Sequence, residues 1–209
     1  QLAGISATDW SWSVLLADFN NDGWKDVHIT NGIGRDFINA DFLEFSNQTF
    51  DAVTDKKEQQ KLIKAKLESL KPVTLSNYLY INNHDYFFKD SSEQAGINEP
   101  SLSNGAAYAD LDNDGDLDIV VNNIDDPVLV YENKSADSVK EFLEINLIGP
   151  GKNRNAIGAK VVLFSGNEIR TYENFPVKGF LSSMQAPLHI GLKNTKIDSL
   201  FLIWPDRTF

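Results

Sequence analysis

Cysteine is absent from this sequence of 209 residues. Its absence excludes disulfide bonds and thiolate metal sites. Histidine is scarce, and His28, His84 and His189 are spaced too widely to indicate a zinc site. No apolar run approaches the roughly 20 residues that a membrane-spanning helix needs. The sequence therefore predicts a chain without a transmembrane span.

Recognisable catalytic motifs are also missing. The chain has no Gly-x-Ser-x-Gly nucleophile elbow, no His-Glu-x-x-His motif and no phosphate-binding loop. His28 falls in a predicted strand, where we expect a structural side chain rather than a base. The net charge is −11, whereas nucleic-acid binding requires Lys/Arg patches. We therefore predict no enzyme, no organic cofactor and no nucleic-acid partner.

What the sequence does contain is two short acidic stretches. Loop 1 is residues 18–26 (Asp-Phe-Asn-Asn-Asp-Gly-Trp-Lys-Asp) and loop 2 is residues 110–118 (Asp-Leu-Asp-Asn-Asp-Gly-Asp-Leu-Asp). Each places oxygen-bearing side chains at positions one, three, five and nine, with glycine at position six. Ca²⁺ takes about six to eight oxygen ligands, which alternate residues of a tight turn can supply. We predict two Ca²⁺ sites, in which residue seven offers its backbone carbonyl; the predicted ligands are Asp18, Asn20, Asp22, Trp24, Asp26, Asp110, Asp112, Asp114, Asp116 and Asp118.

An acidic surface turn is the simpler alternative, because Asp-Gly and Asn-Gly are ordinary turn formers. Two loops in the same register favour the metal site, since crowded carboxylates without a cation repel one another. An EF-hand is rejected because its position twelve is a glutamate, where this chain has Ile29 and Val121. Short apolar stretches flank each loop, β-branched on the C-terminal side, so each loop should join the two strands of a hairpin.

The two loops lie within a longer internal repeat. Residues 3–31 and 95–123 align without a gap, and they share Ala-Gly-Ile, Ser11/Ser103, Ala17/Ala109 and Asn31/Asn123 as well as the loop residues. A second echo links residues 78–83 (Tyr-Leu-Tyr-Ile-Asn-Asn) with residues 128–133 (Val-Leu-Val-Tyr-Glu-Asn). Repetition of strand-rich units is typical of propellers and solenoids.

These motifs resemble the FG-GAP/VCBS repeat family. Its repeat combines a Leu-Tyr-x-Asn-Asn strand, an x-Phe-x-Asp strand, Ala-Gly-Ile and a calcium hairpin, and the chain has this order at 79–83, 87–90, 95–97 and 110–118. The resemblance implies blades of a β-propeller in which calcium fixes an outward hairpin. Asn20 departs from the aspartate usual at position three and removes one charge. We therefore expect loop 2 to bind calcium more tightly than loop 1.

The tail resembles the ASPIC/UnbV domain. The resemblance rests on residues 155–160 (Asn-Ala-Ile-Gly-Ala-Lys), 179–183 (Gly-Phe-Leu-Ser-Ser), 188–192 (Leu-His-Ile-Gly-Leu) and 197–206 (Ile-Asp-Ser-Leu-Phe-Leu-Ile-Trp-Pro-Asp). The family usually continues as Trp-Pro-Asp-Gly, whereas Arg207 follows Asp206 here. Alternating apolar residues predict a small, sandwich-like β domain.

Residues 33–75 form an insert outside both resemblances. Residues 55–71 are rich in helix formers, Ile63, Leu67 and Leu70 recur at helical spacing, and Pro72 marks the stop. We predict one helix near 55–71. The insert is either an elaboration that packs on the propeller rim or a surface that binds a partner.

The predicted fold is all-β, with a partial β-propeller over residues 1–134, including the helical insert, and a β-sandwich-like C-terminal domain over residues 140–209. We expect the C-terminal part of a larger protein, because propellers close with about four to eight blades. The leading hypothesis is a non-catalytic, calcium-binding module for extracellular recognition or adhesion, with a protein or glycan ligand at the cell surface. One alternative is a nutrient-capture component beside an outer-membrane transporter, for which Trp10, Trp12 and Trp24 would be stacking platforms. Another is the non-catalytic part of a larger enzyme. The expected location is extracellular or cell-surface, and outer-membrane-associated in a bacterium.

Overall fold

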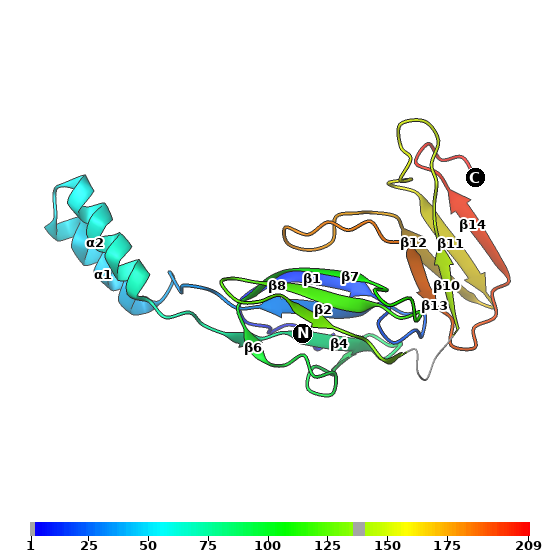
Figure 1. The fold of residues 1–209 in the computed structure, drawn as a ribbon, viewed down its shortest axis with the longest axis horizontal. Coiled ribbons are helices and arrows are strands. Elements are labelled where there is room, and N and C mark those ends of the chain that lie inside the picture. Colours follow the sequence, from blue (N-terminus) through cyan, green and yellow to red (C-terminus); the bar gives the residue numbers. More distant parts are fainter. Residues whose placement is uncertain (1–2, 136–140) are drawn as a thin grey trace.

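The computed structural model describes residues 3–135 and 141–209. Figure 1 shows three parts in a row: a pair of helices at one end, the sheets of the two repeats in the middle, and the C-terminal domain at the other end. The fold is built of β-strands in several sheets, and within the described residues no sheet closes into a barrel. The predicted all-β class, with a partial propeller and a second β domain, is confirmed.

The first repeat forms an antiparallel sheet of four strands in the order β1-β2-β4-β5. Loop 1 joins the first two strands, because β1 ends at residue 17 and β2 begins at residue 26. The helical insert separates β2 from the rest of the sheet. The bounds are β1 (Ser11–Ala17), β2 (Asp26–Asn31), β4 (Tyr78–Asn82) and β5 (Phe88–Asp90).

The second repeat reproduces this hairpin. Its described strands, in the order β7-β8-β9, are β7 (Ser103–Ala109), β8 (Asp118–Asn123) and β9 (Leu129–Tyr131). Ala17 pairs with Asp26 in the first hairpin, and Ala109 pairs with Asp118 in the second. Both pairings shift register at the same place, after Ser11 and after Ser103. The gapless repeat in the sequence is thus a repeat in backbone structure.

The sequence similarity between residues 78–83 and 128–133 is displaced by one residue in the structure. Tyr80 pairs with Val27, and Tyr131 pairs with the corresponding residue Ile119. Residue 80 therefore matches residue 131, so that Asn82, and not Asn83, corresponds to Asn133. The one-residue error changes which side chains share a face, because alternate residues of a strand point to opposite sides.

The main hydrophobic core lies between the two repeat sheets. Leu15 from β1 and Leu79 from β4 are buried against Val121 and Ile119 from β8, with Ile97 beside them. A smaller cluster, Val27, Ile29 and Tyr80, covers the opposite face of the first sheet. Packing on both faces explains why β2 has no exposed residue. It is the packing expected of a propeller blade.

The C-terminal domain is a sandwich of two small sheets. One pairs β10 (Phe142–Ile145) with β13 (Leu188–Gly191), and the other has the order β12-β11-β14, with β11 (Lys160–Ser165), β12 (Glu168–Glu173) and β14 (Ser199–Ile203). Val161, Leu163, Tyr172 and Ile190 form its buried core, to which both sheets contribute. The strand β12 was not predicted, because charged and polar residues occupy four of its six positions (EIRTYE).

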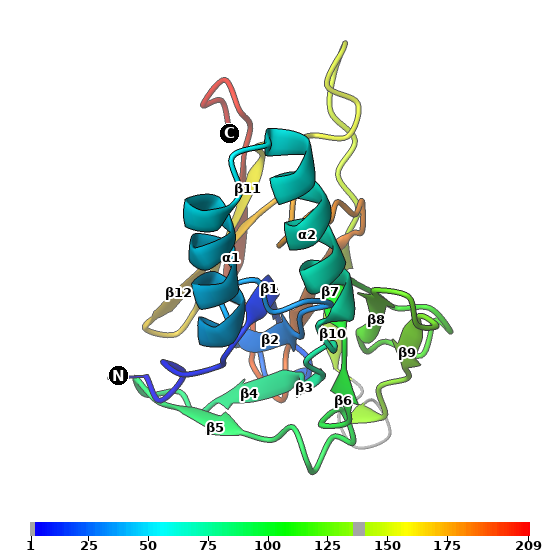
Figure 2. The same cartoon turned by 90° about the vertical axis from the view of Figure 1, so that its left-hand side faces the viewer.

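The insert forms an arm of two helices, α1 (Ala40–Ala52) and α2 (Lys56–Ser69). Its base is closed by a bridge between Ile33 and Val73 and by the pairing of β3 (Leu75–Ser76) with β6 (Pro100–Ser101). Figures 1 and 2 show the arm projecting away from the sheets, at the end opposite the C-terminal domain. Neither helix has the length and hydropathy that crossing a membrane requires.

The predicted helix near 55–71 overlaps α2, whereas α1 was missed. Asn39 caps α1 by accepting hydrogen bonds from the backbone N–H groups of Asp41 and Phe42. The sequence of α1, ADFLEFSNQTFDA, contains Ser, Asn and Thr, which are weak helix formers, and its aromatic residues hide the helical spacing.

Candidate metal centres

Loops 1 and 2 have the same backbone conformation. Asn21 and Gly23 lie at φ values of 56° and 88°, and Asn113 and Gly115 lie at 62° and 96°. Positions four and six are therefore left-handed in both loops. Asn tolerates this region better than most residues, and Gly enters it without strain. The local sequence thus determines a turn that brings alternate side chains to one side.

In both loops the first carboxylate accepts hydrogen bonds from the backbone N–H groups of residues five and six. The donor–acceptor pairs are Asp22 N to Asp18 Oδ1 (3.0 Å), Gly23 N to Asp18 Oδ2 (2.7 Å), Asp114 N to Asp110 Oδ1 (3.2 Å) and Gly115 N to Asp110 Oδ2 (3.1 Å). These bonds hold the carboxylate inside the turn. Within the described residues, Asp18 Oδ1 and both carboxylate oxygens of Asp110 each accept a single hydrogen bond and keep a further lone pair for a cation.

The ninth carboxylate is held in the same way in both loops. It accepts one bond from residue two of its own loop and another from a residue at the end of the third strand of its sheet or just beyond it. The pairs are Phe19 N to Asp26 Oδ2 (3.0 Å), Asn82 N to Asp26 Oδ1 (2.9 Å), Leu111 N to Asp118 Oδ2 (2.9 Å) and Asn133 N to Asp118 Oδ1 (2.8 Å). Asn82 and Asn133 anchor the site although the sequence did not mark them as site residues. Asn82 ends β4 and Asn133 follows β9, the strands that pair with β2 and β8, and this repeated position was the signal.

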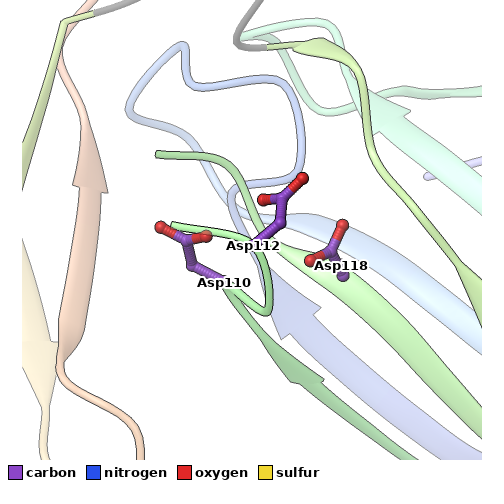
Figure 3. Close-up of side chains that lie close together, drawn as sticks. All are labelled: Asp110, Asp112 and Asp118. Atoms are coloured by element: carbon purple, nitrogen blue, oxygen red, sulfur yellow. The ribbon is translucent and has the colours of Figure 1, made fainter. Parts of the chain in front are cut away.

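Loop 2 brings three of its predicted ligands together. Carboxylate oxygens of Asp110, Asp112 and Asp118, drawn in Figure 3, all lie within 4.8 Å of one another. Two oxygens that bind one Ca²⁺ at about 2.4 Å are up to about 5 Å apart, so this spacing fits a single ion. Asp114 is exposed and accepts a hydrogen bond from Asp116 N (3.1 Å). Among the described residues, this is the one group of three or more Asp, Glu, His or Cys side chains whose ligand atoms lie this close together.

Loop 1 is more buried than loop 2. Asp18, Asp22 and Asp26 are all buried, and burial raises the pKa of Asp18 to about 6 and that of Asp26 to about 7. Asp22 Oδ2 accepts a hydrogen bond from Asn20 Nδ2 (3.0 Å) and lies 2.7 Å from His84 Nε2. A divalent cation would favour the ionised form of these carboxylates and offset the cost of their burial.

The residues of both loops fit a hard cation. The donor set consists of carboxylate and amide oxygens with the carbonyl of residue seven, and no thiolate or imidazole occupies a ligand position. Oxygen ligands of this kind suit Ca²⁺ rather than zinc or copper. Residues 18, 20, 22, 24 and 26 would hold an ion in loop 1, and residues 110, 112, 114, 116 and 118 would hold one in loop 2.

Comparison with known families identifies two segments of the chain. Residues 74–121 match the model of the FG-GAP-like repeat, and residues 149–209 match the model of the ASPIC and UnbV domain. An FG-GAP-like repeat is followed here by an ASPIC/UnbV domain. The order is the one predicted from the sequence. A search of curated proteins found no match to the chain.

The matched FG-GAP-like segment contains the whole of loop 2 and ends within β8. Loop 1 lies outside it. Its assignment to the same class of loop rests on the shared register and on the hydrogen bonds above. The ASPIC/UnbV match covers β11 to β14 and thus both sheets of the sandwich, although β10 precedes it.

The three tryptophans proposed as stacking platforms are all partly buried. Trp10 packs edge-on against Phe37, and Trp12 lies 4.8 Å from Phe180. Trp24 is stacked on His84 at 5.2 Å and also lies under the guanidinium of Arg170. Rings that are already in contact with other side chains offer little free surface, so their burial does not favour nutrient capture by these residues.

Proposed function

We propose that the chain is a non-catalytic, calcium-stabilised part of an extracellular or cell-surface recognition protein. The observation that carries the proposal is that two loops of the same backbone conformation place oxygen-bearing side chains at the same four positions. FG-GAP-like repeats are typical of extracellular or surface proteins. Extracellular calcium is millimolar, a concentration that suits the weaker calcium loops of outer modules.

The proposed role of the ion is structural. Each loop connects two strands, and its first and ninth carboxylates come from opposite sides of the turn. An ion bound to both would clamp the hairpin in its folded geometry. A ligand that binds only the folded state stabilises it by RT ln(1 + [Ca²⁺]/Kd).

The helical arm supports the recognition part of the proposal. None of the residues of α2 is buried, and Leu43 and Phe50 on α1 are 46% and 56% exposed. Exposed apolar side chains on an element that stands clear of the sheets are a feature of interaction surfaces. We infer that the arm contacts the protein or glycan ligand, rather than packing on the rim of its own propeller.

The positions of the histidines support a non-catalytic role. His28 is fully buried and cannot exchange a proton with a substrate. His84 lies against Asp22, and His189 lies against Asn21 and the ring of Phe142. Each is therefore engaged in packing or in contacts at the loops. A panel of glycan and peptide substrates tests this point, and any turnover that survives purification would contradict it.

Calorimetric titration of Ca²⁺ into chelator-treated protein tests the main proposal. We expect two binding events, of which Asp22→Ala removes one and Asp114→Ala the other, and a rise in the melting temperature with calcium. Absence of heat and of a thermal shift up to about 10 mM Ca²⁺, above the range of extracellular modules, would overturn it. The recognition role is tested by binding to glycan and matrix-protein arrays, which Leu43→Glu with Phe50→Glu should abolish without lowering the melting temperature.

A further inference from the structure

The C-terminal domain meets the repeat region at loop 1. The backbone N–H of Gly191, at the end of β13, donates a hydrogen bond to Asp18 Oδ2 over 2.9 Å. The same oxygen accepts the N–H of Gly23 from loop 1 itself. A residue far along the chain therefore acts on the first ligand of the predicted calcium site in the same way as the loop's own backbone.

This approach is possible because residue 191 is glycine. A Cβ atom at this position would overlap the backbone of Asn21 and Oδ2 of Asp18. The residue is also buried. The close approach explains physically why glycine stands at position 191, within the segment 188–192 of the ASPIC/UnbV domain.

Further contacts surround the same turn. The hydroxyl of Tyr172 on β12 donates to the carbonyl oxygen of Gly23 over 3.2 Å, and His189 Nε2 lies 2.6 Å from Asn21 Oδ1. Asn21 in turn donates through Nδ2 to the carbonyl oxygen of Gly115 in loop 2 (2.9 Å). The C-terminal domain thus holds positions four and six of loop 1 as well as its first ligand.

Within residues 3–135 and 141–209, Asp110 of loop 2 accepts no corresponding bond from the C-terminal domain. Among the described residues, Asp110 accepts from Asp114 N and Gly115 N, both within loop 2. The ring of Phe142 covers Gly115, but it offers no hydrogen-bond donor. The two loops therefore share their ligand positions, but among the described residues the C-terminal domain donates a hydrogen bond to the first ligand of loop 1 alone, which makes loop 2 an internal control.

We propose that the C-terminal domain completes the calcium site of loop 1, with Gly191 and Tyr172 as positioning residues, so that calcium binding and docking of the domain reinforce each other. The proposal rests on calcium binding as proposed above. Outer hydrogen-bond partners orient metal ligands, and their loss typically weakens metal affinity by about 10-fold to 100-fold. Because coupling is reciprocal, calcium must strengthen the docked state by the factor by which docking strengthens calcium binding.

The first test measures calcium affinity in full-length protein carrying Asp114→Ala, in which only loop 1 is intact. We expect Gly191→Ala to weaken the remaining site by about tenfold or more. Gly34→Ala is the matched control, since a Cβ there would only contact Ile124 at 3.7 Å, and it should leave the affinity unchanged. Tyr172→Phe, which removes a single hydroxyl, should weaken the site by a smaller factor and covers the case in which Gly191→Ala does not fold.

The second test follows hydrogen exchange at the Gly191 amide, whose proton makes the bond to Asp18. Calcium should slow this exchange in Asp114→Ala protein but not in Asp22→Ala protein, in which only loop 2 is intact. If calcium binds the wild-type protein, yet the variants keep its affinity and the Gly191 amide exchanges at the same rate, the coupling is wrong and the calcium proposal stands. If the wild-type protein binds no calcium, both proposals fail together.

Discussion

The hydroxyl of Ser11 donates a hydrogen bond to Oδ1 of Asn31 over 2.7 Å and links β1 to β2 at the end remote from loop 1. Ser103 makes the same bond to Asn123 in the second repeat, over 2.8 Å. Asn31 is fully buried, and its Nδ2 donates to the carbonyl oxygen of Ser76 on β3 (2.8 Å). One amide therefore connects three strands, which accounts for the shared Ser and Asn positions in the sequence.

Asn31→Ala should lower the free energy of unfolding by about 2 kcal/mol, because it leaves buried polar partners unsatisfied. Urea denaturation in saturating calcium measures this change. Asn122→Ala is the matched control, since Asn122 is exposed and its side chain bonds to Asn104 at the surface. The control should change stability by less than about 0.5 kcal/mol. Equal losses in the two variants would show that the buried amide has no special role.

The charge difference between the loops predicts their relative calcium affinity. Position three is Asn20 in loop 1 and Asp112 in loop 2, so the four side-chain ligands carry three formal charges in the first loop and four in the second. Asn20→Asp should raise the calcium affinity of loop 1 by about tenfold, and Asp112→Asn should lower that of loop 2 by about tenfold. The reason is that one unit charge beside a divalent ion is worth at least about 1.4 kcal/mol. Titration calorimetry of the two reciprocal variants measures both changes.

The reciprocal variants also separate charge from environment. If loop 1 binds calcium more tightly than loop 2 in the wild-type protein, the hydrogen bonds that loop 1 receives from the C-terminal domain outweigh the missing charge. In that case the ranking by charge is wrong, but each substitution should still shift affinity in its stated direction. A change in the opposite direction would contradict the oxygen-ligand assignment of position three.

The hairpins of the two repeats could be predicted from the sequence to the level of single strands, whereas the short strands β3 and β6 were not predicted. Their signals are local, because short apolar stretches on both sides of an Asp-rich turn, β-branched on the C-terminal side, specify a hairpin wherever they occur. The glycine at position six and the spacing of the loop acids were also local and identified the two loops. The structure added which acids converge, and it placed Asp110, Asp112 and Asp118 together.

What the sequence could not predict depends on contacts between distant segments. No spacing rule connects Gly191 with Asp18, or His189 with Asn21, since these pairs meet only after two domains have folded and docked. The helix α1 was missed for a different reason. Its stability comes from the cap at Asn39 and from packing against α2, and propensity alone does not show either.

Proton release should accompany calcium binding at loop 1. Burial raises the pKa of Asp18 to about 6 and that of Asp26 to about 7, so both carboxylates retain protons in the folded, metal-free protein at pH 6. Calcium must displace these protons, and its affinity for loop 1 should fall as the pH drops from about 7.5 to 5.5. In the metal-free protein, a lower pH favours the folded state instead. The two groups, whose pKa values are raised by burial, stabilise the fold below about pH 4 and lose that contribution as the pH rises to about 7.

Titrations of Asp114→Ala protein at pH 6 in two buffers of different ionisation enthalpy measure the effect. We expect between about one and two protons released per calcium ion, from the fractions protonated at the two pKa values. Repeating the titration at pH 7.5 is the control, since fewer protons remain on Asp18 and Asp26 at that pH. An apparent enthalpy that does not depend on the buffer at pH 6 would contradict the prediction.

His28 predicts a separate loss of stability in acid. Its side chain lies on β2, opposite Leu15, is fully buried, and has no hydrogen-bond partner for either ring nitrogen among the described residues. Burial lowers the pKa of His28 to about 4. Because the unfolded chain binds this proton at the ordinary pKa of about 6.5, protonation favours unfolding. The stability contributed by neutral His28 is complete above about pH 6.5 and is lost as the pH falls toward 4, by about 3 kcal/mol in total.

His28→Leu should remove this dependence, because a leucine of similar size fills the core without a titrating group. At pH 7 we expect the variant to be at least as stable as the wild-type protein, since it no longer buries two unsatisfied nitrogens. Urea midpoints at pH 4.5, 5.5 and 7.0, in saturating calcium, measure the difference between the two proteins. The loop carboxylates contribute nearly equally to the pH dependence of both proteins. A difference between the two urea midpoints that grows as the pH falls is therefore due to His28. Two curves that stay parallel from pH 7.0 to 4.5 would mean that His28 reaches solvent or a partner when it is protonated.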